Sequence, residues 1–323
     1  MPHRYFCTYF DSHYLLRGLI LYRSLRQHVP AFTLWALCFD DLAFDALTRL
    51  GWPGLQPIRL ADFERGDDEL ATAKTDRSCI EYYFTCTPSL PLYLFRQQPQ
   101  LDVLTYLDAD LCFYDQLTPV YEELGDNSVL IVPHRFPAEL QDRNRYGIYN
   151  VGWLTFRNDA VGRACLGWWR ERCLEWCYDR VEDGKFADQK YLDDWPQRFP
   201  GVNVLRHPGA GLAPWNWMNY SLQLANGRLT VDRQPLIFYH FHGLRVFNRW
   251  LSDPGLANYK AGMPRPIRNW LYGGYLRAWR AIWEEVRHIS AITPGYSSLN
   301  SRTGSRRTVV KRLLMGQLLI HGV

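Results

Sequence analysis

The part of the sequence that most constrains the fold is the run 103–114, which reads VLTYLDADLCFY. Its first half, 103–107, is apolar and rich in strand formers, and it follows a polar segment. A short apolar run between polar turns predicts a buried strand of the kind found in parallel sheets. Ligands of open α/β sheets bind beyond the carboxyl ends of such strands. Asp108 and Asp110 follow the strand directly, so we expect both carboxylates at a ligand-binding edge.

These two carboxylates allow a functional and a structural interpretation. Carboxylates held close together repel each other unless a cation or a shared proton relieves the repulsion. Their oxygen atoms suit Mg²⁺ or Mn²⁺, ions that also hold substrate phosphates. The alternative is a pair of solvated aspartates at a strand end, since the D-x-D pattern is common. Apolar sequence on both sides, 103–107 and 111–113, favours the functional interpretation.

The rest of the chain alternates predicted strands with predicted helices. Strands are expected at 4–10, 32–39, 55–60, 128–133, 153–156, 202–205, 229–231 and 236–239, and helices at 14–28, 45–50, 158–181 and 270–289. The polar segment 62–76 is interpreted as a loop or lid, and 77–95 as a helix broken at its two prolines. Such alternation predicts an α/β fold with a mostly parallel sheet flanked by helices. We expect a catalytic domain at 1–262, with halves at about 1–115 and 116–262, and a helical C-terminal extension at 263–323.

Charge is unevenly distributed along the chain. No acidic residue follows Glu285, whereas six basic residues do: Arg287, Arg302, Arg306, Arg307, Lys311 and Arg312. The whole chain of 323 residues carries +4, so the first 285 residues carry −2. A near-neutral body argues against nucleic-acid binding. The basic and apolar segment 306–320 predicts a helix lying on a membrane surface, with a packing helix or a frayed tail as the alternative.

Cysteine usage and hydropathy indicate the cellular compartment. The sequence has eight cysteines, none in a C-x-x-C pair, and several lie in apolar runs. They are interpreted as small buried hydrophobic residues of a reducing compartment, and a zinc site at Cys173 and Cys177 as a weaker alternative. We find no signal-peptide pattern and no apolar run of 18 residues. We therefore expect a cytoplasmic protein, in contact with the membrane only through its basic C-terminus.

Three further polar clusters are candidates for a binding site. Asp188 and Gln189 fall where a helix is expected to begin. His240 and His242 alternate at the end of a predicted strand, which places both on one face, although such a pair is more often structural than metal-binding. In the segment 215–217, Trp faces can stack on sugar rings and the Asn amide can bond hydroxyls, and a core loop is an equal alternative.

Four of these landmarks, taken in order, resemble the GT-A glycosyltransferases, especially the family 8-like retaining enzymes of bacterial lipopolysaccharide assembly. They are Asp108-Ala109-Asp110, Asn150-Val151-Gly152, Asp188-Gln189 and His240-Phe241-His242-Gly243. The resemblance covers about residues 4–245. It implies a GT-A fold and transfer of a sugar from a nucleotide-sugar, most often UDP-linked, to a hydroxyl of a glycan or glycolipid acceptor. It also implies Mn²⁺ or Mg²⁺ as the cofactor.

The resemblance assigns roles by position. The metal ligands would be Asp108, Asp110 and His240, and the catalytic pair Asp188, which binds sugar hydroxyls, and Gln189, which lies beneath the anomeric carbon. The donor would be bound by Thr8, Tyr9, Asp11, Tyr14, Arg77, Asp108, Ala109, Asn150, Gly243 and Arg245. The acceptor is expected to contact Trp215, Asn216, Trp217 and His242.

The sequence departs from the family pattern at two positions that bear on the donor. The diphosphate-binding lysine that usually follows H-x-x-G is missing, and Arg245 would replace it from one position earlier. The family's donor-binding arginine matches Ser89 here, so Lys74 or Arg77 would take that role. Two other functions stay open: a sugar-phosphate nucleotidyltransferase, whose glycine-rich loop is absent, and a carbohydrate-binding protein with a degenerate site.

Overall fold

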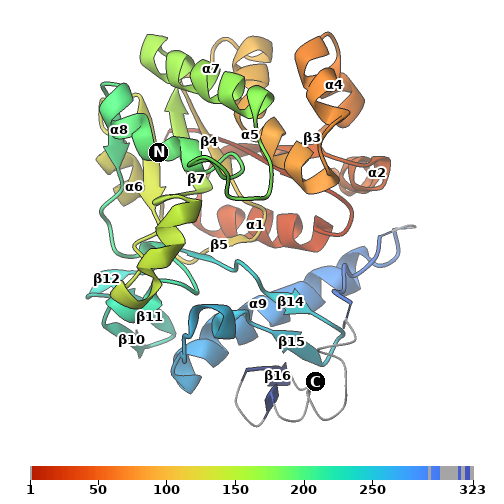
Figure 1. Ribbon diagram of the computed structural model, residues 1–323. Helices are drawn as coiled ribbons and strands as arrows, with labels where there is room; N and C mark the ends of the chain where they lie inside the picture. Colours follow the sequence, from red (N-terminus) through yellow and green to blue (C-terminus); the bar gives the residue numbers. More distant parts are fainter. Residues whose placement is uncertain (1, 290–291, 299–311, 314–316, 321–323) are drawn as a thin grey trace.

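The computed structural model describes residues 2–289, 292–298, 312–313 and 317–320. Its centre is a seven-stranded sheet in the order β3-β2-β1-β4-β7-β6-β8 (Figure 1). The strands are β1 (Arg4–Phe10), β2 (Phe32–Cys38), β3 (Leu55–Arg59), β4 (Val103–Leu107), β6 (Val129–Pro133), β7 (Tyr149–Arg157) and β8 (Val202–Val204). β7 runs antiparallel to both of its neighbours, and the other pairs are parallel. The α/β class and the mostly parallel sheet are thus confirmed.

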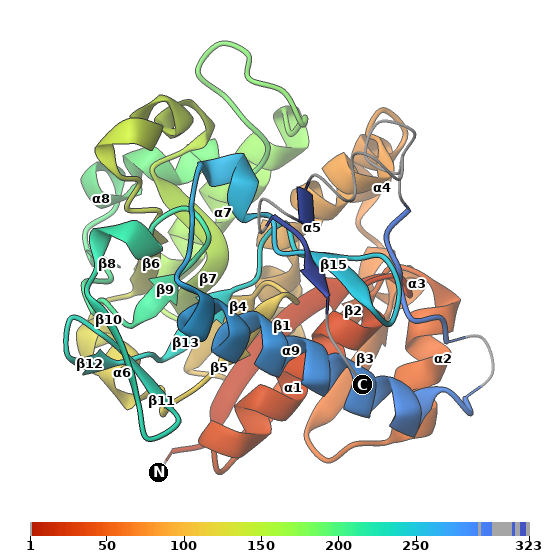
Figure 2. The same ribbon diagram turned by 90° about the horizontal axis from the view of Figure 1, so that it is seen from below.

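Helices cover both faces of the sheet and bury two hydrophobic clusters. The helices are α1 (Leu15–His28), α2 (Asp41–Leu50), α5 (Cys79–Gln97), α6 (Thr118–Leu124), α7 (Ala160–Glu175), α8 (Trp195–Arg198) and α9 (Arg265–Val286). α5 and α7 pack on one face, whereas α1 lies on the other with α9 beside it (Figures 1 and 2). Neighbouring strand residues point to opposite faces, so Phe6 joins the α1 cluster and Cys7 the α5 cluster.

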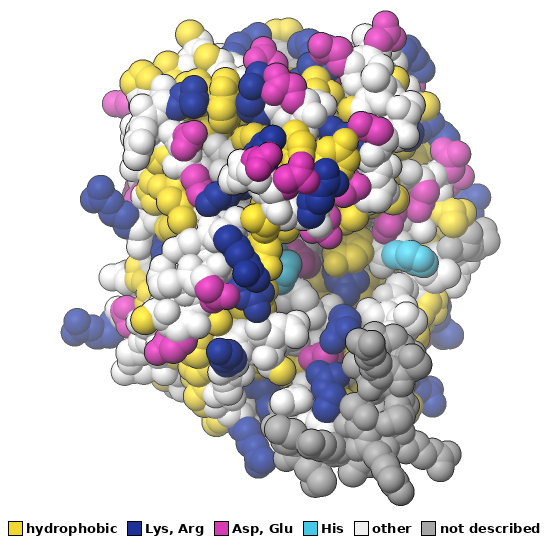
Figure 3. All heavy atoms as spheres, in the orientation of Figure 1, with side chains coloured by type: hydrophobic (Ala, Val, Ile, Leu, Met, Phe, Trp, Pro, Cys, Tyr) yellow, Lys and Arg dark blue, Asp and Glu magenta, His cyan; other side chains and the backbone are white. Residues whose placement is uncertain are grey.

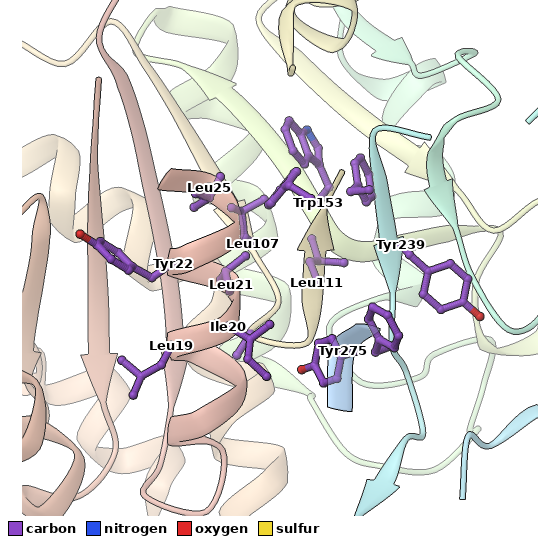
Figure 4. Packing of buried hydrophobic residues seen from close by; sticks show 14 of the residues in the cluster. Leu19, Ile20, Leu21, Tyr22, Leu25, Leu107, Leu111, Trp153, Tyr239 and Tyr275 are labelled. Carbon is purple, nitrogen blue, oxygen red and sulfur yellow. The ribbon is translucent and has the colours of Figure 1, made fainter. Parts of the chain in front are cut away.

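A small second sheet continues from the end of β4 and positions the site. It has the order β5 (Leu111–Phe113), β13 (Phe238–His240) and β9 (Ala210–Leu212), and His240 pairs with Leu111 in antiparallel register. Figure 4 shows Leu107 and Leu111 in the buried packing beside Leu21 and Leu25 of α1. This anchoring fixes both ends of the turn that carries Asp108 and Asp110.

The helix α9 of the C-terminal extension supports β13 from behind. Its buried face belongs to the same hydrophobic cluster as α1 and β13. The hydroxyls of Tyr239 and Tyr272 lie 2.8 Å apart, and the ring of Phe241 stacks on Tyr275 with centroids 4.0 Å apart. Because side chains alternate along an extended segment, Tyr239 and Phe241 face α9, whereas His240 and His242 face away from it.

Two segments fold differently from the sequence predictions on the α5 side. The predicted loop 62–76 contains two short helices, α3 (Leu60–Glu64) and α4 (Asp68–Lys74), because Asp67 caps α4 and Leu70 is buried beneath it. The prolines do not break α5, which runs unbroken from Cys79 to Gln97. Its Ser78 and Glu81 form a capping box, and its apolar face is buried in the core, which offsets the missing backbone hydrogen bonds.

Helix α7 ends at Glu175 and not near 181 as predicted, because Trp176 is extended and starts a long loop. The predicted interruption at 150–152 is a register shift inside β7 and not its end. Of the predicted strand 236–239, only residues 238 and 239 lie in a strand, β13. The preceding β12 (Gln234–Pro235) forms a separate small sheet with β11 (Arg228–Val231) and β10 (Leu222–Ala225).

The prediction of a surface helix at 306–320 is wrong for its last residues, 317–320, which the structure describes. Leu319–Ile320 form strand β16 against β15 (Leu251–Asp253), and Leu318 and Leu319 are buried. The backbone of this stretch therefore completes a small sheet with β14 (Arg245–Val246). Most of the predicted helix, 306–311 and 314–316, lies outside the described residues. Across the described ranges, no helix is both long enough and apolar enough to span a bilayer.

Six of the cysteines are buried as predicted, and Cys173 and Cys177 lie in the core beside α7. Cys112 is half-buried, whereas Cys79, at the start of α5, is exposed. The interpretation of the cysteines as buried hydrophobic residues is therefore wrong for Cys79. Its position in the first turn of the helix turns its side chain away from the core.

Candidate active site

The two carboxylates of the D-x-D segment and His240 come together at the end of β4. Nε2 of His240 lies 3.0 Å from Oδ1 of Asp110 and 3.6 Å from Oδ2 of Asp108. Asp110 and His240 are buried, and Asp108 is half-buried and accepts a hydrogen bond from the Tyr106 hydroxyl at 2.8 Å. The structure therefore brings the three predicted metal ligands into one cluster.

Backbone geometry fixes this cluster from two sides. The amide of Asp108 donates to the carbonyl of Gly152 at 2.9 Å, and the amide of Phe241 donates to the carbonyl of Asp110 at 2.9 Å. Gly152 is required by close approach, because a β-carbon there would lie 2.9 Å from Cε1 of His240. The Asn150 carboxamide oxygen accepts the Gly152 amide at 2.9 Å, which holds the register shift of β7 in place.

Electrostatics separate the two carboxylates. Burial, together with the negative charge of Asp110, raises the pKa of Asp108 to about 6 although His240 opposes the change. Burial would also raise the pKa of Asp110, but the charge and hydrogen bond of His240, with contributions from His242 and Arg17, hold that pKa at about 2. The site is thus an anionic cluster whose second negative charge is costly until a cation arrives.

The cluster opens into a cavity of about 880 Å³. Figure 3 shows a hollow in one face of the molecule, with histidine and acidic side chains at its back and Lys and Arg side chains around it. Asp108, His240 and His242 line one side of the cavity, and Asp188 and Gln189 also line it. Its remaining walls include aromatic side chains, among them Tyr9, Phe84, Phe136, Tyr146, Phe186, Trp215 and Tyr259.

Asp188 is a buried acid with an unused acceptor. Its backbone carbonyl accepts a hydrogen bond from Nε1 of Trp169 at 2.8 Å, while Oδ2 has no hydrogen-bond partner in the described structure. Burial raises its pKa to about 7, and the charge of Asp108 adds to this effect. Gln189 donates from Nε2 to the Tyr146 carbonyl at 3.0 Å, which ties it to the cavity wall. A buried oxygen without a partner is a natural acceptor for a ligand hydroxyl.

Of the three neighbouring residues 215–217 that were expected to bind the acceptor, only one lines the cavity. Trp215 lines the cavity, and its ring lies 5.4 Å from His240 and 5.5 Å from His242. Asn216 is fully buried and its carboxamide bonds the carbonyls of His134 and Gly211 and the amide of Ala213. Trp217 packs against the core and does not line the cavity. The core-loop alternative is therefore correct for Asn216 and Trp217.

Some of the residues expected to bind the donor line the main cavity or lie near it, others line a second pocket, and Arg77 lines neither. Tyr9 and Asn150 line the main cavity, and Thr8 is buried nearby in β1. Asp11 accepts a hydrogen bond at 3.1 Å from the amide of Tyr14, the residue just before α1. Ala109 is buried in the D-x-D turn. The exception is Arg77, whose guanidinium bonds Asp76, Tyr178 and the Leu174 carbonyl outside the cavity, so this prediction is wrong.

A second pocket of about 440 Å³ is lined by Tyr14, Gly243 and Arg245 together with Arg17. Asp253 is almost fully buried and accepts hydrogen bonds from Arg245 at 2.8 Å and from Arg312 at 2.7 Å. The charge of Arg245 is therefore already paired. Gly243 has φ +73°, a conformation that favours glycine, and it turns the chain from the histidines toward β14.

Sequence reasoning missed several residues that the fold brings to the site. Arg17 on α1 is 4% exposed, and its guanidinium donates to the Leu244 carbonyl at 2.9 Å and lies over the rings of Tyr14 and Trp279. It forms no ion pair with a carboxylate of the described chain. His134, Arg143, Arg145 and Tyr259 line the main cavity. An arginine inside the apolar stripe of a predicted helix was the one available signal, because charged residues are rarely buried without a partner.

The residues present fit a divalent ion. The donors are carboxylate oxygens of Asp108 and Asp110 and an imidazole nitrogen of His240, a set that suits Mn²⁺. Burial, together with the lesser effect of the Asp110 charge, raises the pKa of Asp108, and a bound cation would favour the charged carboxylate. Asp110, His240 and His242 also each offer a ligand atom, and these atoms all lie within 4.8 Å of one another. The site can therefore hold an ion and the anionic groups that this ion attracts.

The seven-stranded sheet, with the acidic cluster at the end of β4, has the GT-A glycosyltransferase fold. The galactosyltransferase LgtC, solved in complex with donor and acceptor sugar analogs, matches over 82% of this chain and 99% of its own, with 18% identity and a TM-score of 0.52. At this identity the likeness concerns the fold.

Sequence similarity identifies the family. The chain is 34% identical over 249 residues to YfnF of Bacillus subtilis strain 168, covering 75% of this chain and 82% of YfnF. It is 29% identical over 245 residues to YfnD of the same organism, covering 75% of this chain and 78% of YfnD. Both relatives are uncharacterized. The sequence matches no family model. The chain belongs to the family of YfnF.

Proposed function

We propose that the protein is a metal-dependent glycosyltransferase that moves a sugar from a nucleotide-sugar, UDP-linked in the first instance, to a hydroxyl of a surface glycan or glycolipid. The observation that carries the proposal is the meeting of Asp108, Asp110 and His240 at one side of a cavity that Asp188 and Gln189 also line. LgtC, which has this fold, binds donor and acceptor sugar analogs. Its complex supports the same two classes of partner here.

Each part of the site has a role in this proposal. Asp108, Asp110 and His240 hold Mn²⁺ or Mg²⁺, and such an ion neutralises the charge that develops on a leaving diphosphate. Asp188 accepts a hydrogen bond from a hydroxyl of the donor sugar through Oδ2, the buried atom that has no partner. Gln189, fixed by Tyr146, lies beneath the anomeric carbon. Trp215 and Tyr259 offer aromatic faces to the acceptor sugar.

We further propose that Arg17 supplies the charge of the missing diphosphate lysine. Arg245, the candidate chosen from the sequence, is paired with Asp253 and so is partly neutralised. Arg17 is buried, forms no close ion pair with a carboxylate of the described residues although its charge acts on Asp110, and shares its pocket with Gly243. A buried guanidinium is costly unless an anion balances it, and a diphosphate would provide that anion.

The reaction is proposed to retain the anomeric configuration. The amide of Gln189 is a weak nucleophile, so we do not expect a stable covalent intermediate. The acceptor hydroxyl would attack from the face that the diphosphate leaves. We also propose a cytoplasmic location with contact between the basic C-terminus and anionic lipid, a proposal supported by the excess of arginine after Glu285.

The experiment that tests the proposal is a ligand screen by thermal unfolding. Nucleoside diphosphates are added with and without Mn²⁺ to the wild type and to Asp110→Asn. A ligand at about 100 times its Kd adds roughly 2.7 kcal/mol to stability. We expect UDP to raise the Tm only with Mn²⁺ and only in the wild type.

The control variant is Asp126→Asn, which removes an exposed acid outside the cavity and should behave as the wild type. Incubation with the UDP-sugar that shifts the Tm most, followed by ¹H NMR of the product, reports the anomeric configuration. Release of pyrophosphate and not UDP would identify a nucleotidyltransferase. An unchanged Tm with every nucleotide would contradict the proposal.

A further inference from the structure

We infer that His242 is an additional ligand of the divalent ion, so that the site holds two imidazoles and selects a first-row transition metal such as Mn²⁺ or Co²⁺ over Mg²⁺. This inference rests on the proposed function and names the class of its metal. It also revises the role of His242, which the sequence suggested as an acceptor contact.

Distances support a common ion. One ligand atom from each of Asp110, His240 and His242 lies within 4.8 Å of the others. Ligands about 2.1 Å from a metal lie at most about 4.2 Å apart across it. A small side-chain adjustment therefore closes the remaining gap. Nε2 of His240 is already 3.0 Å from Asp110, so His242 is the ligand that would move.

The ring of His242 is held by aromatic contacts, and its nitrogens are free of hydrogen bonds to described residues. Its ring packs edge-on against Trp215, with centroids 5.5 Å apart at 73°, and against His240, 5.6 Å apart at 90°. Neither ring nitrogen has a hydrogen bond to a described residue, and the side chain is exposed to the cavity. An imidazole that is held in place with free nitrogens beside a carboxylate–imidazole pair is placed to bind a cation.

Contacts on both sides of the chain explain why both histidines reach the same ion. His240 ends β13 and His242 lies in the turn that follows, with its ring 5.6 Å from that of His240, while α9 holds Tyr239 and Phe241. The hydrogen bond between the Phe241 amide and the Asp110 carbonyl then fixes the distance between this segment and the D-x-D turn. His242 is thus placed by the same contacts that place His240.

Ligand chemistry decides the metal. Mg²⁺ prefers oxygen ligands and keeps several waters, whereas imidazole nitrogen suits transition ions. Mg²⁺ tolerates one imidazole beside two carboxylates. A second imidazole favours transition ions, which bind nitrogen more tightly than Mg²⁺ does. We therefore expect Co²⁺ and Mn²⁺ to bind more tightly than Mg²⁺ in the wild type.

The test is calorimetric titration of the EDTA-treated full chain with Mn²⁺, Co²⁺ and Mg²⁺, each with and without UDP. For His242→Ala we expect at least a tenfold loss of Mn²⁺ and Co²⁺ affinity and a changed visible spectrum of the Co²⁺ complex. Mg²⁺ affinity should change less than threefold. Because His242 is exposed, the substitution should leave the Tm of the metal-free protein unchanged.

Two comparisons complete the design. His3→Ala removes an exposed imidazole outside the cavity and should leave every affinity unchanged. Equal Mn²⁺ and Co²⁺ affinities in the wild type and in His242→Ala would overturn this inference and leave the transferase proposal standing. Failure of the wild type to bind any of these ions, with or without UDP, would overturn both.

Discussion

Gly152 lies so close to His240 that the site has no room for a side chain at position 152, because an added β-carbon would lie 2.9 Å from Cε1 of the imidazole. The same β-carbon would lie 2.6 Å from Oδ1 of Asn150. The absence of a side chain at Gly152 therefore leaves room for the imidazole of His240, which comes from a distant strand. This contact links two sequence landmarks that are far apart in the chain.

Gly152→Ala is expected to weaken Mn²⁺ binding at least tenfold although it removes no ligand. The added methyl group displaces His240 from its position 3.0 Å from Asp110. Calorimetry with Mn²⁺ measures the loss. The matched control is Gly167→Ala on α7, where an added β-carbon meets nothing within 4 Å. That substitution should raise helix stability by up to about 1 kcal/mol without changing Mn²⁺ affinity. Unchanged Mn²⁺ affinity in Gly152→Ala would contradict this prediction and would show that His240 accommodates the added methyl group.

Arg17→Gln is expected to weaken UDP binding at least tenfold in the presence of Mn²⁺, with a smaller effect on UMP. The reason is that the guanidinium is proposed to face the diphosphate, and UMP lacks the second phosphate. Titration of both nucleotides gives the ratio, and Arg17→Lys should restore part of it.

Arg23→Gln on the same helix is the control, since Arg23 pairs with the exposed Glu285 and lines neither pocket. A parallel loss of UDP and UMP binding in Arg17→Gln would indicate that Arg17 only supports the fold. Arg245→Gln should have the weaker effect of the two pocket arginines, because Asp253 already balances its charge.

Asp188 makes the metal-free protein less stable as the pH rises. Its pKa is raised from 3.8 to about 7 in the folded state, so the folded state binds more protons than the unfolded state between these values. The contribution of Asp188 to the free energy of unfolding is therefore fully present below about pH 4 and falls until about pH 7. The loss is about 1.4 kcal/mol per pKa unit, or a few kcal/mol in all. Urea unfolding of Asp188→Asn across this window should show a shallower decline than the wild type. An identical decline would place the pH dependence elsewhere.

Asn216→Ala is expected to lower the free energy of unfolding by about 2 kcal/mol or more, because it removes the side chain that bonds the buried Ala213 amide and Gly211 carbonyl. The KM for the acceptor should stay the same in protein that folds. Trp215→Leu should raise the acceptor KM, since Trp215 lines the cavity, and it should also lower stability, because the indole donates to the buried His134 carbonyl. Acceptor titrations and urea unfolding of the two variants separate these roles. A raised KM in Asn216→Ala would restore its predicted acceptor contact.

Local patterns determined much of this molecule. The strand before Asp108 and Asp110, the helix after β1 and the amphipathic helix now seen as α9 follow from hydrophobic periodicity, which depends only on nearby residues. The alternation in His240-Phe241-His242 likewise predicted that both histidines share a face, and the structure confirms it. The family resemblance then ordered Asp108, Asp110 and His240 into one expected cluster, which the structure brings together.

Tertiary structure decided whatever depended on contacts between distant segments. The sequence could not show that Asp253 neutralises Arg245, that Arg77 bonds Tyr178, or that Asn216 serves the backbone of a neighbouring loop. Nor could it show that Arg17 is buried without a close ion pair to a carboxylate of the described residues. Charge pairing and burial depend on the environment that the whole fold creates around a side chain. For this reason, residue type and spacing located the site, and packing determined which of its residues are available to a ligand.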